Sequence, residues 1–214
     1  MAQKELDDTI LFKITDWIAK LAYVNLLWVG FTIMGGVVLG LFPATVALFF
    51  ITRKWVLGEK PVSLVKSFFQ AFREDFWKAN AIGYSAGALG VFLFTDVFLA
   101  STLDNAFGFW LTFFFSVLFI LFLTMVVFLF PLFVHVKESF YHYFKFAFLI
   151  GLSSLHYLLF IITGSALAIA LFAMVPAAAI FFAASVFAMI ITLFSMKAFD
   201  RVENRKRGDG SLAS

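Results

Sequence analysis

The sequence predicts an all-α protein: a polytopic bundle of about six transmembrane helices, with amphipathic helices at the membrane surface. Three observations carry this prediction. Hydrophobic residues make up 63% of the 214 positions, charged residues make up only 14%, and the charges are confined to a few short segments. Soluble domains average about 45–50% apolar and about 25% charged residues, so this composition describes one integral membrane domain, 1–214, that lies mostly in the lipid bilayer.

Four stretches of the chain carry no charged residue, namely 21–52, 79–95, 105–136 and 146–196. A transmembrane helix needs about 20 apolar residues, so the last stretch has room for two spans and a turn. The first stretch is long for one span, and glycines and a proline interrupt it near its middle. We expect a turn at Gly40, Pro43 and Thr45, with a second helix starting near Pro43, because proline is tolerated in the first turn of a helix.

The positions of the basic residues predict the orientation of these spans. All 16 Lys and Arg residues fall within segments 1–20, 53–78, 137–145 and 197–207. Loops rich in Lys and Arg stay on the cytoplasmic side of a membrane. This rule predicts three hairpins in the cell membrane with both termini in the cytoplasm, and it assigns the basic clusters to topology and not to nucleic acid. In the five-span alternative the first stretch crosses once, and the N-terminal basic group lies outside.

Two segments outside the spans have helical amphipathic patterns. Residues 1–20 carry apolar side chains at spacings of three and four, which indicates an interfacial helix leading into the first span. Residues 58–78 are expected to form a cytoplasmic amphipathic helix with Phe68, Phe72 and Phe76 on one face and Arg73 on the other. Such a helix lies on the inner leaflet or binds a partner. These four residues are the predicted partner-binding surface.

The remaining spans follow in order. The third, 79–100, has Gly83, Gly87 and Gly90 spaced for close packing against another helix. The fourth spans about 109–133, and the last two divide near Val175 and Pro176. Residues 197–214 form the predicted cytoplasmic tail.

The sequence offers little material for catalysis, cofactor binding or metal binding. No cysteine is present, and the nucleophile-elbow, phosphate-loop and dinucleotide patterns are absent. Only His135, Glu138 and His142 have metal-like spacing, and ligands so spread rarely close around one ion. Asp96 is the one charge expected within a span, near its rim. We therefore predict no catalytic, cofactor or metal site, and we assign neutral residues such as Asn25 and Asn80 to helix packing.

Several short runs of the sequence carry a family resemblance, namely 21–28 (LAYVNLLW), 41–48 (LFPATVAL), 53–55 (RKW) and 68–73 (FFQAFR). Together these runs resemble the YesL-like family of bacterial integral membrane proteins, a family of unknown function. Other members often carry glycine immediately before the proline of the turn, where this chain has Phe42. Members are often encoded beside carbohydrate ABC importers, so the resemblance implies an accessory role in sugar uptake, in contact with the importer's membrane subunits. The contact surface would be the amphipathic helix or the glycine face, and a transporter or facilitator in its own right is the alternative.

Overall fold

The computed structural model describes residues 2–59 and 62–211, and every regular element in that part of the chain is an α-helix. The described helices are α1 (Ala2–Met34), α2 (Val38–Val56), α3 (Leu64–Glu74), α4 (Phe76–Ser101), α5 (Ala106–His135), α6 (Phe140–Ser153), α7 (Leu155–Met174) and α8 (Pro176–Ser211). Six of them, all but α3 and α6, are long and apolar enough to cross a membrane. The all-α prediction with six spans is confirmed.

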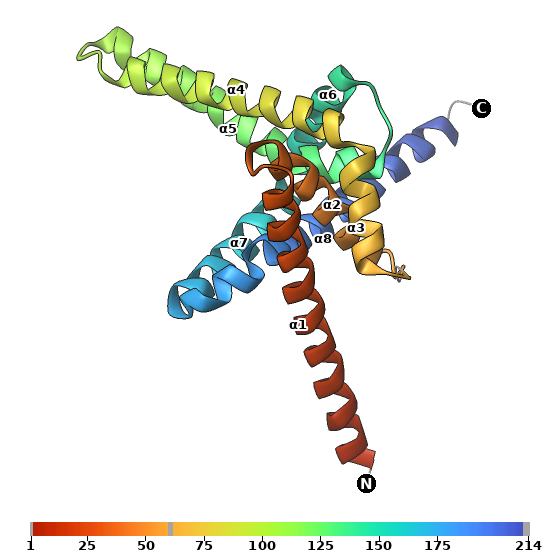
Figure 1. Cartoon of the computed structure of the whole chain (residues 1–214). Coiled ribbons are helices and arrows are strands. Elements are labelled where there is room, and N and C mark those ends of the chain that lie inside the picture. The colour runs from red at the N-terminus through yellow and green to blue at the C-terminus, as the bar shows by residue number, and fades with distance from the viewer. Residues whose placement is uncertain (1, 60–61, 212–214) are drawn as a thin grey trace.

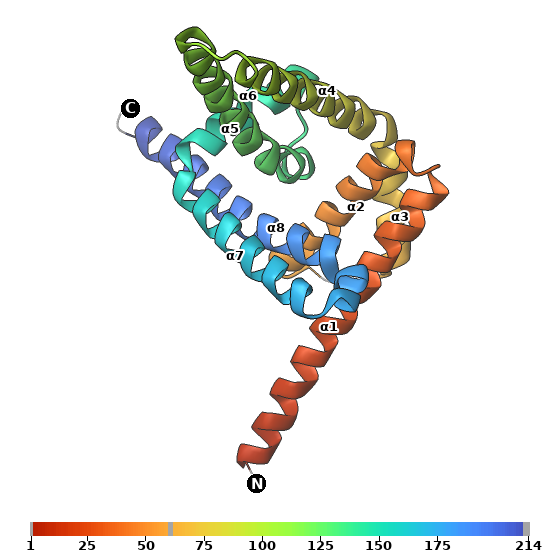
Figure 2. The same ribbon diagram turned by 90° about the vertical axis from the view of Figure 1, so that its left-hand side faces the viewer.

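The six long helices form three hairpins, α1–α2, α4–α5 and α7–α8 (Figure 1). Helix α2 lies at the centre, since it contacts α1, α3, α4, α5 and α8. In Figure 1 the turns of the α4–α5 and α7–α8 hairpins lie at the left, and the start of α3, the α5–α6 connection and the end of α8 lie at the right. We call this right-hand side the basic end. From the central junction the hairpins spread apart toward their turns (Figure 2).

The α1–α2 turn lies earlier in the chain than predicted. It consists of Gly35, Gly36 and Val37, and the last two have positive φ angles of 77° and 59°. Helix α2 then starts at Val38, so the predicted turn residues Gly40, Pro43 and Thr45 all lie within the helix. Gly40 lets the start of α2 lie close against the end of α1, since a Cβ at this position would lie 2.3 Å from the carbonyl oxygen of Thr32.

Pro43 is accommodated inside α2 by a contact with α4. In a helix the N–H of residue 43 would bond to the carbonyl of Leu39, and proline has no N–H to donate. The Nδ2 of Asn80 donates to this carbonyl instead, at 3.0 Å. The Thr45 hydroxyl accepts a hydrogen bond from Trp28 Nε1 at 3.1 Å, which ties α2 to α1. The three predicted turn residues therefore fix the packing of α2.

Four other helix boundaries differ in detail from the sequence prediction. Helix α1 passes through residue 20 without interruption, so the expected interfacial segment is continuous with the first span. The expected helix 58–78 is two elements, because α3 ends at Glu74 and α4 begins at Phe76; residues 60 and 61 lie outside the described residues. Helix α6 is an additional short helix. Helix α8 starts as predicted, at Pro176, and extends to Ser211, through most of the expected tail 197–214. Met1 and residues 212–214 lie outside the described residues.

Buried polar side chains join α8 to the first hairpin. Asn25 of α1 is 2% exposed; its Nδ2 donates to the carbonyl of Ile180 at 2.9 Å, and its Oδ1 accepts from the N–H of Ser185 at 3.1 Å. The hydroxyls of Thr52 and Thr192 are 2.9 Å apart. Hydrogen bonds between side chains and neighbouring helices contribute to helix association in lipid. Their positions agree with the packing role predicted for the neutral polar residues.

Candidate functional site

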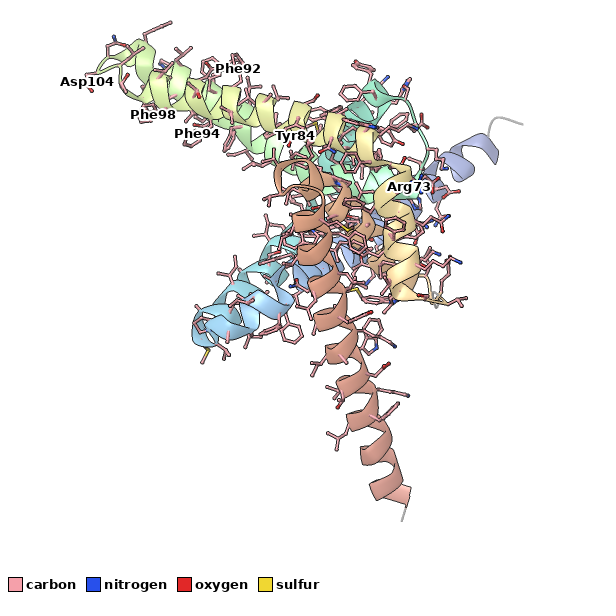
Figure 3. All side chains as sticks on the ribbon, in the orientation of Figure 1. Arg73, Tyr84, Phe92, Phe94, Phe98 and Asp104 are labelled. Atoms are coloured by element: carbon pink, nitrogen blue, oxygen red, sulfur yellow. The ribbon has the colours of Figure 1, made fainter. Side chains whose placement is uncertain are left out.

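The aromatic stripe predicted to bind a partner lies largely in the protein's own core. Phe68 is 0% exposed and Phe72 is 7% exposed, and both rings pack on Phe31 of α1, with centroids 5.1 and 5.3 Å apart. Phe76 is the first residue of α4, and its ring contacts Phe72 at 5.5 Å. The expectation that Phe68 and Phe72 are exposed anchors is therefore corrected: α1 covers the apolar face of α3. Arg73 is exposed on α3 (Figure 3).

The three glycines of α4 do not form one packing face. A Cβ on Gly83 would lie 2.2 Å from the ring of Phe42 on α2, and one on Gly90 would lie 3.0 Å from the ring of Phe122 on α5. A Cβ on Gly87 would meet nothing within 4 Å. Gly83 and Gly90 thus pack against two different helices, and Gly87 is exposed.

The candidate metal-binding pattern is not brought together. Helix α5 ends at His135 and α6 begins at Phe140, so Glu138 lies in the connection and the three side chains do not share a helical face. Among the described residues no group of His, Asp and Glu could hold a metal ion. His142 bonds to the hydroxyl of Ser139.

A polar cavity of about 470 Å³ lies at the basic end, where α2, α3, α4 and the α5–α6 connection meet. Its lining carries four basic and three acidic side chains, together with neutral polar groups. The charged residues are Arg53, Lys54, Lys78, Lys137, Glu74, Asp75 and Glu138, and the neutral ones include Ser67, Gln70, His135 and Tyr143. Pockets of about 300–1,000 Å³ hold small ligands, so this cavity is the candidate functional site.

The acidic wall of the cavity lies at the junction of α3 and α4. Lys137 Nζ lies 3.5 Å from a carboxylate oxygen of Glu74. Burial, followed by the charge of Glu74, raises the pKa of Asp75 above its ordinary value of 3.8, although Lys78 and Lys137 act in the opposite direction. The acidic side chains of this wall are thus matched by two lysines.

The opposite wall, at the end of α2, carries cations without a carboxylate partner. Arg53 Nε donates to Nδ1 of His135 at 3.4 Å, and Lys54 Nζ lies 4.7 Å from the centroid of the Phe50 ring. Neither ion pair formed by the described side chains includes Arg53 or Lys54. The cavity is therefore polarised, with unpaired positive charge on its α2 side.

An apolar pocket of about 520 Å³ adjoins the polar cavity. The two share His135, Val136 and Glu138 in their linings. The His135 ring stacks on Phe199 of α8, with centroids 4.8 Å apart, so this residue stands between the two spaces. The rest of the apolar pocket is formed mainly by Leu132, Phe146, Leu149, Ile150, Phe199 and Val202, with Ser153 and Glu203 as its remaining polar residues.

The sequence did not identify this pair of cavities. From the sequence alone Arg53 and Lys54 indicate only topology, and His135 belongs only to the candidate metal-binding pattern. The available signal is the recurrence of charged residues in three short runs, 53–54, 74–78 and 137–138. Because these runs belong to separate elements, α2, the α3–α4 junction and the α5–α6 connection, their convergence depends on the fold.

The α4–α5 hairpin carries two acidic residues near its turn. Asp96 lies in α4, with one carboxylate oxygen buried and without a hydrogen-bond partner among the described residues. Asp104 lies in the α4–α5 turn (Figure 3). Ionisable residues within spans are costly and are often functional.

The chain is similar in sequence to known proteins of one family. Residues 21–97 match the model of a family described as "Protein of unknown function, DUF624". YteU of Bacillus subtilis (strain 168) is 36% identical over 172 residues, covering 76% of this chain and 71% of the relative. The chain belongs to the DUF624 family. YesL of the same strain is 29% identical over 190 residues, covering 89% and 90%, and YesV is 28% identical over 186 residues, covering 87% and 89%.

The match confirms the resemblance to YesL-like proteins. The three DUF624 relatives are named as uncharacterized proteins. No solved structure matches the chain. The family match extends from α1 to α4, so it includes the α2, α3 and α4 walls of the polar cavity.

Proposed function

We propose that this DUF624 protein is a non-enzymatic accessory membrane protein of carbohydrate uptake, which binds the membrane subunits of a sugar ABC importer. The observation that carries the proposal is the separation of its hairpins. Half of the α2 span is buried within the chain, whereas only 11% of the α7 span and 17% of the α8 span are buried. The α4–α5 and α7–α8 hairpins spread apart and leave long helix faces uncovered (Figure 2).

Exposed apolar side chains alone are expected on any membrane protein, because lipid covers them. Small exposed residues are more specific, since they let the backbone of another helix approach closely. Ala166, Ala170 and Ala173 are exposed on α7 at spacings of four and three, and Gly87 is exposed on α4. These positions favour a protein helix as the neighbour. The sugar-related part of the proposal is supported by the YesL-like resemblance.

The α4–α5 hairpin offers a second uncovered face. Phe94 is 60% exposed and Phe98 is 61% exposed. In Figure 3 both lie along the edge of the hairpin that faces α7 and α8, and Phe92 lies on the other edge. We assign the edge with Phe94 and Phe98 to the importer.

Affinity purification from native membranes tests this function. Tagged wild-type protein should recover importer membrane subunits, and Ala170→Trp should recover less, because its bulk prevents close helix approach. Leu167→Trp is the matched control, since Leu167 on the same helix is already large and is 68% exposed. Failure of the wild type to recover any importer subunit, from membranes in which the importer is detected, would contradict the proposal.

The polar cavity favours a second candidate, a small-solute transporter or facilitator. A cavity of about 470 Å³ with charged and neutral polar groups has room for a small solute. Uptake of labelled sugars by purified protein in liposomes tests this candidate. Flux above that of empty vesicles would support it, and equal flux would dismiss it.

A further inference from the structure

We propose that the basic end holds a binding site for an anionic phospholipid, with the phosphate-bearing head in the polar cavity and an acyl chain in the apolar pocket. This inference goes beyond the accessory function and does not depend on it. It rests on the unpaired cations of α2, the shared wall at His135 and the accessible rim of the apolar pocket.

The head group would be bound mainly by Arg53. Its Nε is used in the bond to His135, and no other hydrogen bond of the guanidinium group is formed with the described residues, so the two terminal nitrogens are available to phosphate oxygens. Arginine binds phosphate through paired, charge-assisted hydrogen bonds. Lys54 is the second cation, and Ser67 and Gln70 of α3 add neutral donors to the same cavity.

The other cations are less suitable for this role. Lys137 is paired with Glu74, and Lys78 lies close enough to Asp75 to influence its ionisation. An anion is therefore drawn toward α2 and away from the α3–α4 junction, where the carboxylates would repel it. This polarity also places the head group beside His135, which separates the two spaces.

The adjoining apolar pocket distinguishes a lipid from a free phosphate ester. A soluble phosphate would need only the polar cavity, and the space of about 520 Å³ beyond His135 would be unused. Leu149, in the lining of this pocket, is 48% exposed, so the pocket is open to the surface of the molecule, where an acyl chain can enter it. Basic pockets between transmembrane helices are a recurrent way of binding anionic lipid head groups.

Native mass spectrometry of the full chain, purified and mixed with defined lipids, tests the site. Wild-type protein should retain one phosphatidylglycerol molecule in preference to phosphatidylcholine. Arg53→Gln should weaken this retention about tenfold or more, because charge-assisted bonds to phosphate are strong. Arg53→Lys should keep part of it, and Arg73→Gln is the control, since Arg73 is exposed and lies outside the cavity lining.

A second pair of variants tests the acyl-chain pocket. Leu149→Trp would fill the rim of the pocket and should weaken phosphatidylglycerol binding. Leu152→Trp changes a residue of α6 with nearly the same exposure, 47%, that does not line the pocket, and should bind as the wild type does. The folding of each variant is checked by its thermal unfolding in detergent.

Three results would overturn the inference. The first is equal retention of phosphatidylglycerol and phosphatidylcholine by the wild type. The second is equal loss in the Arg53→Gln and Arg73→Gln variants. The third is binding of soluble glycerol phosphate as tight as that of the lipid, unaffected by Leu149→Trp, which would assign the cavity to a free phosphate ester.

Discussion

A single methyl group at position 83 should disturb the contact between α2 and α4. In Gly83→Ala the new Cβ would lie 2.2 Å from Cγ and Cδ1 of Phe42. Carbon atoms in contact lie about 3.5–4.0 Å apart, so the ring has to move by more than about 1 Å. It cannot move freely, because it is stacked on Phe130, with centroids 6.2 Å apart, and contacts the edge of Tyr84 at 4.9 Å.

The matched variant Gly87→Ala isolates the cost of this collision. Both glycines lie in the interior of α4, and replacing glycine by alanine in a helix gains about 1 kcal/mol at either position. Nothing lies within 4 Å of a Cβ at Gly87, so Gly87→Ala should keep this gain. Overpacking costs about 1–3 kcal/mol, so Gly83→Ala should be less stable than Gly87→Ala by that amount.

Equilibrium unfolding in mixed detergent micelles, followed by circular dichroism, measures the difference. The two variants share their chemistry, helix and change in propensity, so their comparison reports the packing at Gly83. Equal free energies of unfolding would refute the reasoning and would show that α2 and α4 do not cross at Gly83.

Three further predictions concern buried or partly buried polar groups. Asn25→Leu should reduce the free energy of unfolding by about 1–3 kcal/mol, because two backbone groups of α8 lose their partner, and an unchanged value would argue against the α1–α8 contact. Asn80→Ala should reduce the free energy of unfolding by about 1 kcal/mol. Adding Pro43→Ala should restore much of this free energy, because an alanine at position 43 has an N–H that can bond to the carbonyl of Leu39. A double variant no more stable than Asn80→Ala would contradict this account of the proline. Asp75→Asn should be more stable than the wild type at neutral pH. Because the pKa of Asp75 is raised in the folded state, protonation of Asp75 stabilises the wild type below pH 3.8, and this stability is lost as the pH rises through the folded-state pKa. Free energies of unfolding measured across the acid range should therefore show the difference between Asp75→Asn and the wild type vanish at low pH.

The number and order of the spans could be predicted because they depend on local properties. The length of each charge-free stretch set how many helices fit, and the proline at 176 marked the last division. The α1–α2 turn could not be placed as well. Pro43 resembles a helix start because it lacks an N–H, but the structure satisfies the freed carbonyl with Asn80, a contact between residues 41 positions apart. Sequence patterns carry no information about such a partner.

The candidate site shows the same limit. The spacing of Phe68 and Phe72 correctly predicted a helix with one apolar face. The pattern could not tell whether lipid, a partner or the protein itself covers that face, and Phe31 of α1 covers it. The polar cavity was missed because its charges lie on separate elements and meet only when α2, α3, α4 and the α5–α6 connection pack together.

Site-specific photocrosslinking in living cells tests the proposed association with an importer most directly. A photoreactive phenylalanine analogue would replace Phe98, and the matched control would replace Phe92, which is 61% exposed like Phe98 and lies on the other edge of the same hairpin. The account predicts that the analogue at position 98 forms an adduct with an importer membrane subunit and that the analogue at position 92 does not. Absence of a protein adduct at both positions, or equal adducts at both, would contradict it.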